Sequence, residues 1–268
     1  MIALFAAALM GATQPACAAP AGADALWTAE ARYVIVGEQH GTTETPAAFA
    51  QLVCAAAARG PVTVALEFPE SMQSDFDAFL AAPDDASAAT LLLATPFSTS
   101  IPDRQDGRGS VAMLEMLQST RRLKAEGRAV TIRTFVSSRR RPDGFDQNYH
   151  ELDMAAGLAR AAKDRPEARV VVLVGSFHAA KARYFADDFL PAAAHLPPGE
   201  VISLQLPQQG GQSWSCTAAG CGPLDIRPVD DVAERGVILR PVDDGLFDGV
   251  LALGPVTASP PALPLSPP

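Results

Sequence analysis

Two short segments of the chain place a histidine three residues after a glycine, directly behind a run of apolar residues. They are "GEQH" at 37–40, which follows "YVIV", and "GSFH" at 175–178, which follows "VVVLV". A glutamate, Glu67, follows a similar run, "VTVAL". Imidazole and carboxylate groups are the side chains that proteins use most for general acid–base catalysis and for holding metals. We therefore expect Glu38, His40, Glu67 and His178 to form one catalytic site.

The elements that would position these residues alternate along the chain. Continuous Val/Ile/Leu runs predict strands, and the segments between them predict helices. The predicted strands are 33–37, 62–68, 129–136 and 168–175, and the predicted helices are 46–58, 70–80, 87–94, 110–126, 146–163 and 179–190. This alternation is typical of an α/β fold with a mostly parallel sheet covered by helices on both faces. In such a sheet, ligands bind beyond the carboxyl ends of the strands, where the four side chains are expected.

The last quarter of the chain has a different pattern. From residue 200 onward, short apolar runs separated by Gly and Pro predict short strands that form a mixed or antiparallel edge. We expect a single α/β domain over residues 25–254. The segment 255–268 is rich in proline and is predicted to be a disordered tail.

The amino-terminal segment resembles an export signal. Residues 1–18 contain an apolar stretch too short to span a bilayer, followed by a small-x-small cleavage pattern at Ala16-Cys17-Ala18. We therefore predict a periplasmic or secreted protein without a transmembrane segment after signal cleavage. Cleavage would remove Cys17, so Cys54 in its apolar helix is expected to be a buried free thiol. Cys216 and Cys221, five residues apart in a Gly-bearing loop, are predicted to form a disulfide.

The charge balance restricts the partners. The formal net charge of −9 argues against general affinity for nucleic acid or for anionic membranes. The arginine run at 139–141 is a local exception that is most often a solvated loop. The run could also attract an acidic substrate. We expect the substrate to be a small molecule or a peptide.

The segments "GEQHGTTETP", "ALEFPE" and "LVGSFHAAK", in that order, resemble the superfamily that joins erythromycin esterase-like proteins with ChaN-like and Tiki/TraB-like proteins. The spacing in "GEQHG" is that of the ChaN-like members. The segment "HELDMAAGLA" is similar to the Arg-Asp-x-x-Met-Ala helix of this superfamily, with His150 and Glu151 in place of the Arg and Asp. The resemblance covers roughly residues 30–190. It implies hydrolysis, or binding of haem or iron.

Three further residues are candidates for binding substrate: Arg108, His150 and Glu151. Arg108 lies in "RQDGRGSVAML", where Ser110 has the position of a helix N-cap. The segment "DGRGS" therefore fits a plain helix entrance as well as it fits a substrate contact.

Two mechanisms fit the four central residues. In one, His40, His178 and one or both of Glu38 and Glu67 hold a divalent metal (Zn, Mn or Fe), which activates water and polarises a carbonyl. In the other, His40 is the general base, Glu38 or Glu67 orients it, and His178 stabilises or protonates the leaving oxygen. Both hydrolyse an ester, lactone or amide, so the enzyme would be an esterase or a metal-dependent peptidase. The alternative class is haem or metal binding without catalysis, with His40, His178 or His150 together with Tyr149 as iron ligands.

Overall fold

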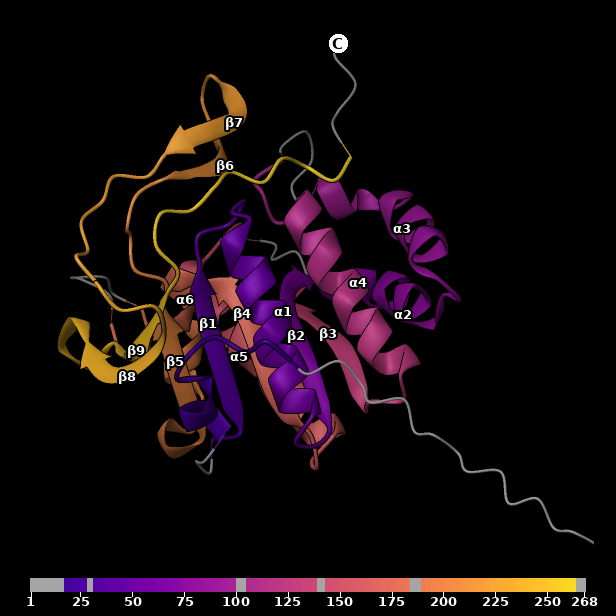
Figure 1. Cartoon of the computed structure of the whole chain (residues 1–268), viewed down its shortest axis with the longest axis horizontal. Coiled ribbons are helices and arrows are strands. Elements are labelled where there is room, and N and C mark those ends of the chain that lie inside the picture. The colour runs from indigo at the N-terminus through magenta and orange to yellow at the C-terminus, as the bar shows by residue number, and fades with distance from the viewer. Residues whose placement is uncertain (1–16, 28–30, 100–104, 139–142, 184–188, 264–268) are drawn as a thin grey trace, which may run out of the picture.

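A computed structural model describes residues 17–27, 31–99, 105–138, 143–183 and 189–263 of the 268-residue chain. A seven-stranded sheet forms its centre, in the order β3-β2-β4-β1-β5-β9-β8 (Figure 1). The strands are β1 (Tyr33–Glu38), β2 (Val62–Pro69), β3 (Val130–Val136), β4 (Arg169–Gly175), β5 (Val201–Gln205), β8 (Gly236–Val242) and β9 (Phe247–Ala252). All neighbours pair in parallel except β8, which is antiparallel to β9. The predicted α/β class is confirmed.

Helices cover both faces of this sheet, as Figure 1 shows. They are α1 (Glu44–Ala57), α2 (Gln73–Ala81), α3 (Asp85–Leu93), α4 (Val111–Ala125), α5 (Gln147–Asp164) and the short α6 (Ser176–Ala179). Successive side chains of a strand point to opposite faces. Accordingly, Val34 and Val36 of β1 pack in the core under α1 to α4, whereas Tyr33 and Ile35 pack in the core under α5 and α6.

The prediction of a helix over 179–190 is wrong for the described residues 180–183 and 189–190, which are not helical. Helix α6 ends at Ala179, and Ala180 is already extended. Residues 184–188, in the middle of the predicted helix, lie outside the described residues.

The carboxyl-terminal strands differ in part from the expected edge. Strand β5 is parallel to β1 and lies inside the sheet, so only the β9–β8 pair forms the predicted antiparallel edge. A separate antiparallel hairpin, β6 (Gln212–Thr217) and β7 (Gly220–Asp225), extends above the sheet (Figure 1). Cys216 and Cys221 are directly opposite in this hairpin and form the predicted disulfide.

The structure differs from the predictions for the two ends of the chain. Cys54 is bonded to Cys17 and is not a free thiol; the prediction failed because it assumed that Cys17 is removed. Most of the predicted signal segment, residues 1–16, lies outside the described residues. The tail predicted to be disordered makes backbone hydrogen bonds up to Leu263, whereas residues 264–268 lie outside the described residues.

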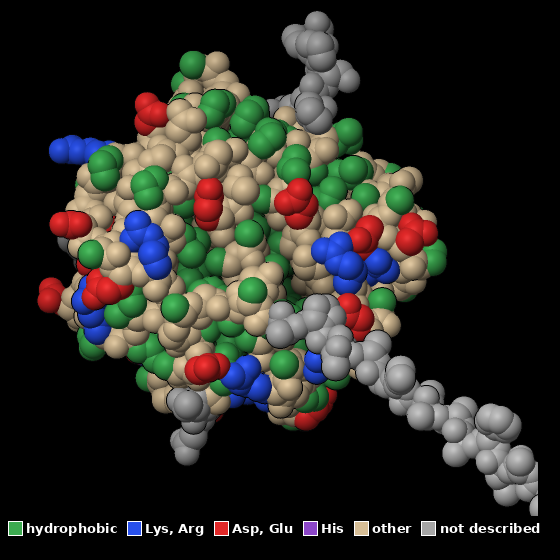
Figure 2. Space-filling model, in the orientation of Figure 1, with side chains coloured by type: hydrophobic (Ala, Val, Ile, Leu, Met, Phe, Trp, Pro, Cys, Tyr) green, Lys and Arg blue, Asp and Glu red, His purple; other side chains and the backbone are tan. Residues whose placement is uncertain are grey.

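The surface in Figure 2 mixes acidic, basic, polar and apolar side chains without a broad field of one charge on that face. No helix of the described part is long and apolar enough to cross a membrane.

Candidate functional site

The predicted site residues meet at the carboxyl ends of three adjacent strands. Strand β4 lies between β1 and β2 and is parallel to both. Glu38 ends β1 opposite Gly175, which ends β4, and Glu67 lies near the end of β2. His178 follows three residues after Gly175. The expectation that Glu38, His40, Glu67 and His178 converge is confirmed by the contacts described next.

His40 lies between two carboxylates. Its Nδ1 is 2.9 Å from Oε1 of Glu38, and its Nε2 is 3.5 Å from Oε2 of Glu67. Burial alone would lower the pKa of His40, but the negative charges of Glu67 and Glu38 outweigh burial and raise this pKa to about 10. His40 is therefore an imidazolium at neutral pH.

Glu67 is the carboxylate at the centre of the site. Its Oε2 accepts the backbone N–H of Gly175 at 2.7 Å, and its Oε1 accepts Nη1 of Arg108 at 2.9 Å. Burial would raise the pKa of Glu67, but the positive charge and hydrogen bond of His40, together with the positive charge of Arg108, hold this pKa far below its usual range. Glu67 is therefore a fixed anion that bonds to both sides of the site.

His178 belongs to a second histidine–carboxylate pair. Its Nδ1 is 2.8 Å from Oε1 of Glu151, and its Nε2 is 4.0 Å from Oε1 of Glu67. Glu151 is fully buried in α5 and also accepts the backbone N–H of Ala192 and the side-chain amide of Gln147. An ionised carboxylate only accepts hydrogen bonds, so Nδ1 of His178 carries a hydrogen toward Glu151, and in the neutral imidazole the lone pair is then on Nε2. The prediction that Glu151 contacts substrate is wrong, because the side chain has no exposed surface and holds His178 instead.

The two motif glycines differ in the space around them. Neither Gly37 nor Gly175 has positive φ, so neither is required by a left-handed backbone. A Cβ on Gly37 would lie 2.9 Å from the Cβ of Ala179, where α6 packs on β1, so glycine is needed there for close packing. A Cβ on Gly175 would lie 3.4 Å from Nε2 of His40 and 3.5 Å from Oε2 of Glu67. These are ordinary contact distances, so a side chain at 175 would border the space between the two histidines without a clash at its Cβ.

Arg108 is part of the same cluster, as the sequence suggested. Its guanidinium bridges Glu67 and Asp106, with 2.6 Å from Nη2 to Oδ2 of Asp106. Burial lowers the pKa of Arg108, but these two carboxylates more than offset it, so the pKa is raised and the charge is fixed. Ser110 also caps α4 as predicted. Asp106 was not predicted, although its position two residues before Arg108 is a visible signal.

The β6–β7 hairpin and the carboxyl-terminal segment hold the loops that carry His40 and Arg108. The carbonyl of Gly41 accepts the backbone N–H of Trp214 at 2.8 Å and that of Ser259 at 2.9 Å. The indole of Trp214 donates to the carbonyl of Gln105, in the Arg108 loop. We call residues 255–263 the carboxyl-terminal strap. These contacts were not visible in the sequence, because they join segments about 110 to 220 residues apart.

His150 lies at the rim of the site beside His178, with ring centroids 5.7 Å apart. Burial and then the neighbouring His178 lower the pKa of His150, which is therefore neutral at pH 7. Its predicted contact with substrate is compatible with this position and stays a prediction. Tyr149 is about half exposed on α5.

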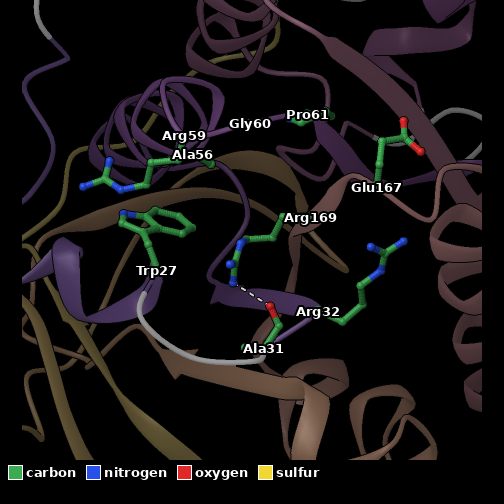
Figure 3. A pocket seen from close by; sticks show the side chains of 9 residues that line it. All are labelled: Trp27, Ala31, Arg32, Ala56, Arg59, Gly60, Pro61, Glu167 and Arg169. Atoms are coloured by element: carbon green, nitrogen blue, oxygen red, sulfur yellow. Dashed lines mark hydrogen bonds between the residues drawn. The ribbon is translucent and has the colours of Figure 1, made fainter.

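A cavity of about 540 Å³ lies at the opposite end of the sheet. Figure 3 shows Trp27 between Arg59 and Arg169, with the two guanidinium carbons 5.9 and 5.7 Å from the ring centroid. Arg59 pairs with Asp24, and Arg169 donates to the carbonyl of Ala31. Arg32 donates to three carbonyls at the end of α5 and just after it. These arginines join the amino-terminal segment to the sheet. None of the predicted site residues lines this cavity, so it carries no catalytic assignment.

Comparisons with known proteins support the fold. The chain resembles a Bacillus cereus protein with a TM-score of 0.62, at 12% identity over 86% of this chain and 90% of that one. It also resembles a variant of erythromycin esterase EreC in its open conformation, with a TM-score of 0.52. The identity is 11% over 85% of this chain and 91% of that one. No protein family matches the sequence, and no curated protein matches it either. The fold is thus shared with an esterase at low sequence identity.

Proposed function

We propose that the protein is a hydrolase of carboxylic esters or lactones, and that the reaction takes place between His40, Glu67 and His178. The observation that carries the proposal is the pair of imidazoles beside Glu67, each with Nδ1 bonded to its own buried glutamate. A histidine oriented in this way by a buried carboxylate can take a proton through its other nitrogen, as in hydrolytic triads. The likeness to an esterase fold is compatible with this class of reaction.

The environments of the histidines give them different roles in the proposed mechanism. His178 has its Nε2 lone pair directed into the site and is the general base that takes a proton from water. The water oxygen attacks the carbonyl carbon. His40, with a pKa raised to about 10, and Arg108 are cations that stabilise the developing oxyanion. The imidazolium of His178 then protonates the leaving oxygen, which releases the acid and the alcohol. This assignment reverses the roles that the sequence suggested.

The experiment is hydrolysis of 4-nitrophenyl acetate and of a simple lactone by the purified chain, by His178→Ala and by His40→Ala. Loss of the base should lower kcat by roughly 10²–10⁴-fold. Loss of one oxyanion-stabilising cation should lower it by roughly 10²–10³-fold. Lys181→Ala, which removes the partly buried ion pair with Asp248, is the control. If no ester, lactone or amide is turned over, the proposal is wrong.

A metal-dependent form of this hydrolysis is the second candidate. The two Nε2 atoms face Glu67 while both Nδ1 atoms bond to carboxylates, which is the usual arrangement around histidine ligands. However, Arg108 already occupies Oε1 of Glu67, and the described residues contain no group of three or more His, Cys, Asp or Glu placed to hold an ion. A bound metal would supply activated water. Elemental analysis of untagged protein, with activity assayed before and after chelation, separates the two forms.

Haem binding without catalysis stays a prediction from the resemblance. Reconstitution with haemin would give a Soret band that His40→Ala, His178→Ala or His150→Ala weakens. A protein that hydrolyses esters and develops no Soret band would exclude this class.

A further inference from the structure

A continuous series of aromatic rings passes through His178 of the site. The ring centroid of Phe145 is 5.6 Å from that of His150, and His150 is 5.7 Å from His178. On the other side, Phe177 is 5.5 Å from His178. We call Phe145, His150, His178 and Phe177 the aromatic row. The distances are those of interacting aromatic pairs, so the row is one contact surface.

The outer end of this row is unusually open. Phe145 is 77% exposed and is the most exposed large apolar side chain of the described residues. Single exposed apolar residues need no explanation. Here, however, the exposed ring is continuous with an imidazole of the site, and the charged groups Arg108 and Asp106 lie on the other loop. His178 thus has aromatic rings on one side and, through Glu67, the charged Arg108 on the other.

A purely structural role explains only part of this arrangement. Asp146 caps α5, so Phe145 and His150 occupy the positions of a hydrophobic staple, which fixes how the chain enters a helix. A staple explains why the two rings are in contact. It does not explain why Phe145 keeps most of its surface in water, where it contributes little burial energy.

We propose that the aromatic row is a binding subsite for a flat apolar group, such as an aryl ring, attached beside the scissile ester bond. The inference rests on the proposed hydrolase function and adds a class of substrate to it. A ring that lies against His150 and Phe145 is next to His178, and therefore places the ester group at the proposed general base. Aryl esters are accordingly preferred over small alkyl esters.

The test compares 2-naphthyl acetate with methyl acetate, using wild type, Phe145→Ala and Phe145→Leu. The ratio of kcat/KM for the naphthyl ester to that for the methyl ester should fall about tenfold in Phe145→Ala, mainly through KM. Phe145→Leu keeps an apolar staple but lacks a ring, so this variant should recover thermal stability and only part of the ratio. Leu91→Ala, at an exposed leucine of α3 on the opposite face of the sheet, is the matched control and should leave the ratio unchanged.

A binding experiment separates this inference from the proposed function. 2-Naphthylacetone, in which a methylene replaces the ester oxygen, cannot be hydrolysed. Its dissociation constant, measured by fluorescence titration, should rise about tenfold in Phe145→Ala and stay unchanged in Leu91→Ala. Equal binding to wild type and Phe145→Ala overturns the subsite even if esters are hydrolysed. A tenfold loss of binding supports the subsite even if the wild type turns over no ester.

The kinetic experiment has its own contrary outcome. If Phe145→Leu fully recovered the naphthyl-to-methyl ratio of kcat/KM, Phe145 would act in the staple alone and the proposal would be overturned.

Discussion

Two histidines from similar sequence motifs acquire different chemistry because their neighbours differ. His40 contacts Glu38 and Glu67, whereas Nδ1 of His178 contacts Glu151 and its Nε2 is left 4.0 Å from Glu67. An imidazole between two carboxylates is stabilised in its protonated, positively charged form. The same glycine, two residues and histidine thus produce a cation at neutral pH in one motif and, in the proposed mechanism, the general base in the other.

The pH dependence of hydrolysis tests this difference. Because the pKa of His40 is raised to about 10, the imidazolium is present at lower pH and is lost as the pH rises through 10. We therefore expect kcat/KM to fall above about pH 10 and this alkaline limb to be absent in His40→Gln. The profile is measured with a lactone after subtraction of spontaneous hydrolysis, with circular dichroism at each pH to verify folding. If His40 were the base, activity would instead rise toward pH 10.

Glu151→Gln tests the second pair at the same scale. The amide keeps the size of Glu151 but removes the negative charge that orients His178 and stabilises its protonated form. In a hydrolytic triad, the corresponding change lowers kcat by roughly 10⁴-fold. We expect a loss of about 10²–10⁴-fold, with a shifted acid limb of the pH–rate profile.

The matched control for this variant is Glu115→Gln, an exposed glutamate of α4 that should have no effect. If Glu151→Gln lowered the thermal stability but left kcat unchanged at a permissive temperature, Glu151 would have only a structural role.

At the scale of elements, the carboxyl-terminal strap connects the loops on which the site is built. Ser259 donates its backbone N–H to Gly41, Val111 donates to Pro260, and Ala262 donates to Gly109. The hydroxyl of Ser259, which is buried, accepts the backbone N–H of Ala112 at the start of α4. The strap therefore fixes the loop of His40 relative to the loop of Arg108.

Truncation of the chain tests this role. A chain that stops after Gly254 lacks these bonds, each of which contributes about 0.5–1.5 kcal/mol. We expect a lower Tm and a loss of kcat of at least tenfold, because the two loops are no longer held together. A chain that stops after Leu263 keeps every strap contact named above and should match the full chain in both measurements. Equal activity of the two truncated chains would show that the strap does not position the site.

The Cys216–Cys221 disulfide lies in the other element that holds these loops. Sγ of Cys216 is 3.4 Å from the carbonyl of Gln105, and the neighbouring Trp214 binds the same carbonyl. We expect Cys216→Ser with Cys221→Ser to lower kcat more than it lowers Tm, since the five-residue separation of the cysteines limits the effect on the unfolded chain. Measuring both kcat and thermal unfolding of this double variant tests the expectation. A large loss of Tm with unchanged kcat would contradict it.

For the whole molecule, the sequence predicts what depends on local pattern. The apolar runs before Glu38, Glu67 and Gly175 were sufficient to predict three parallel strands and a common end for them. The side-chain partners were not predictable. Whether Glu151 points to solvent or to His178 depends on how α5 packs on the sheet, and both outcomes are compatible with its place in a helix.

Composition misled the prediction at the two ends of the chain. Six prolines in the segment 255–268 indicate disorder, yet proline keeps its carbonyl, and Pro260 uses it to accept the N–H of Val111. Cys17 appeared to belong to a removed signal, but it is bonded to Cys54 on α1. Both contacts join distant segments, and neither leaves a local pattern.

The Cys17–Cys54 bond predicts where the mature chain begins. If the amino-terminal segment is a cleaved signal, as the sequence predicts, this bond requires cleavage before Cys17 and not after Ala18. The cysteines are 37 residues apart, so a loop-entropy argument gives about 4 kcal/mol of stabilisation, against about 2 kcal/mol for the separation of five in the hairpin. Cys17→Ser with Cys54→Ser should therefore lower the free energy of unfolding more than the paired hairpin substitution, as measured by urea unfolding of exported protein.

Intact mass under non-reducing conditions should show a chain that contains Cys17 and has no free thiol. A mature chain that starts after Cys17, with Cys54 alkylated by iodoacetamide, would contradict the prediction and restore the free buried thiol.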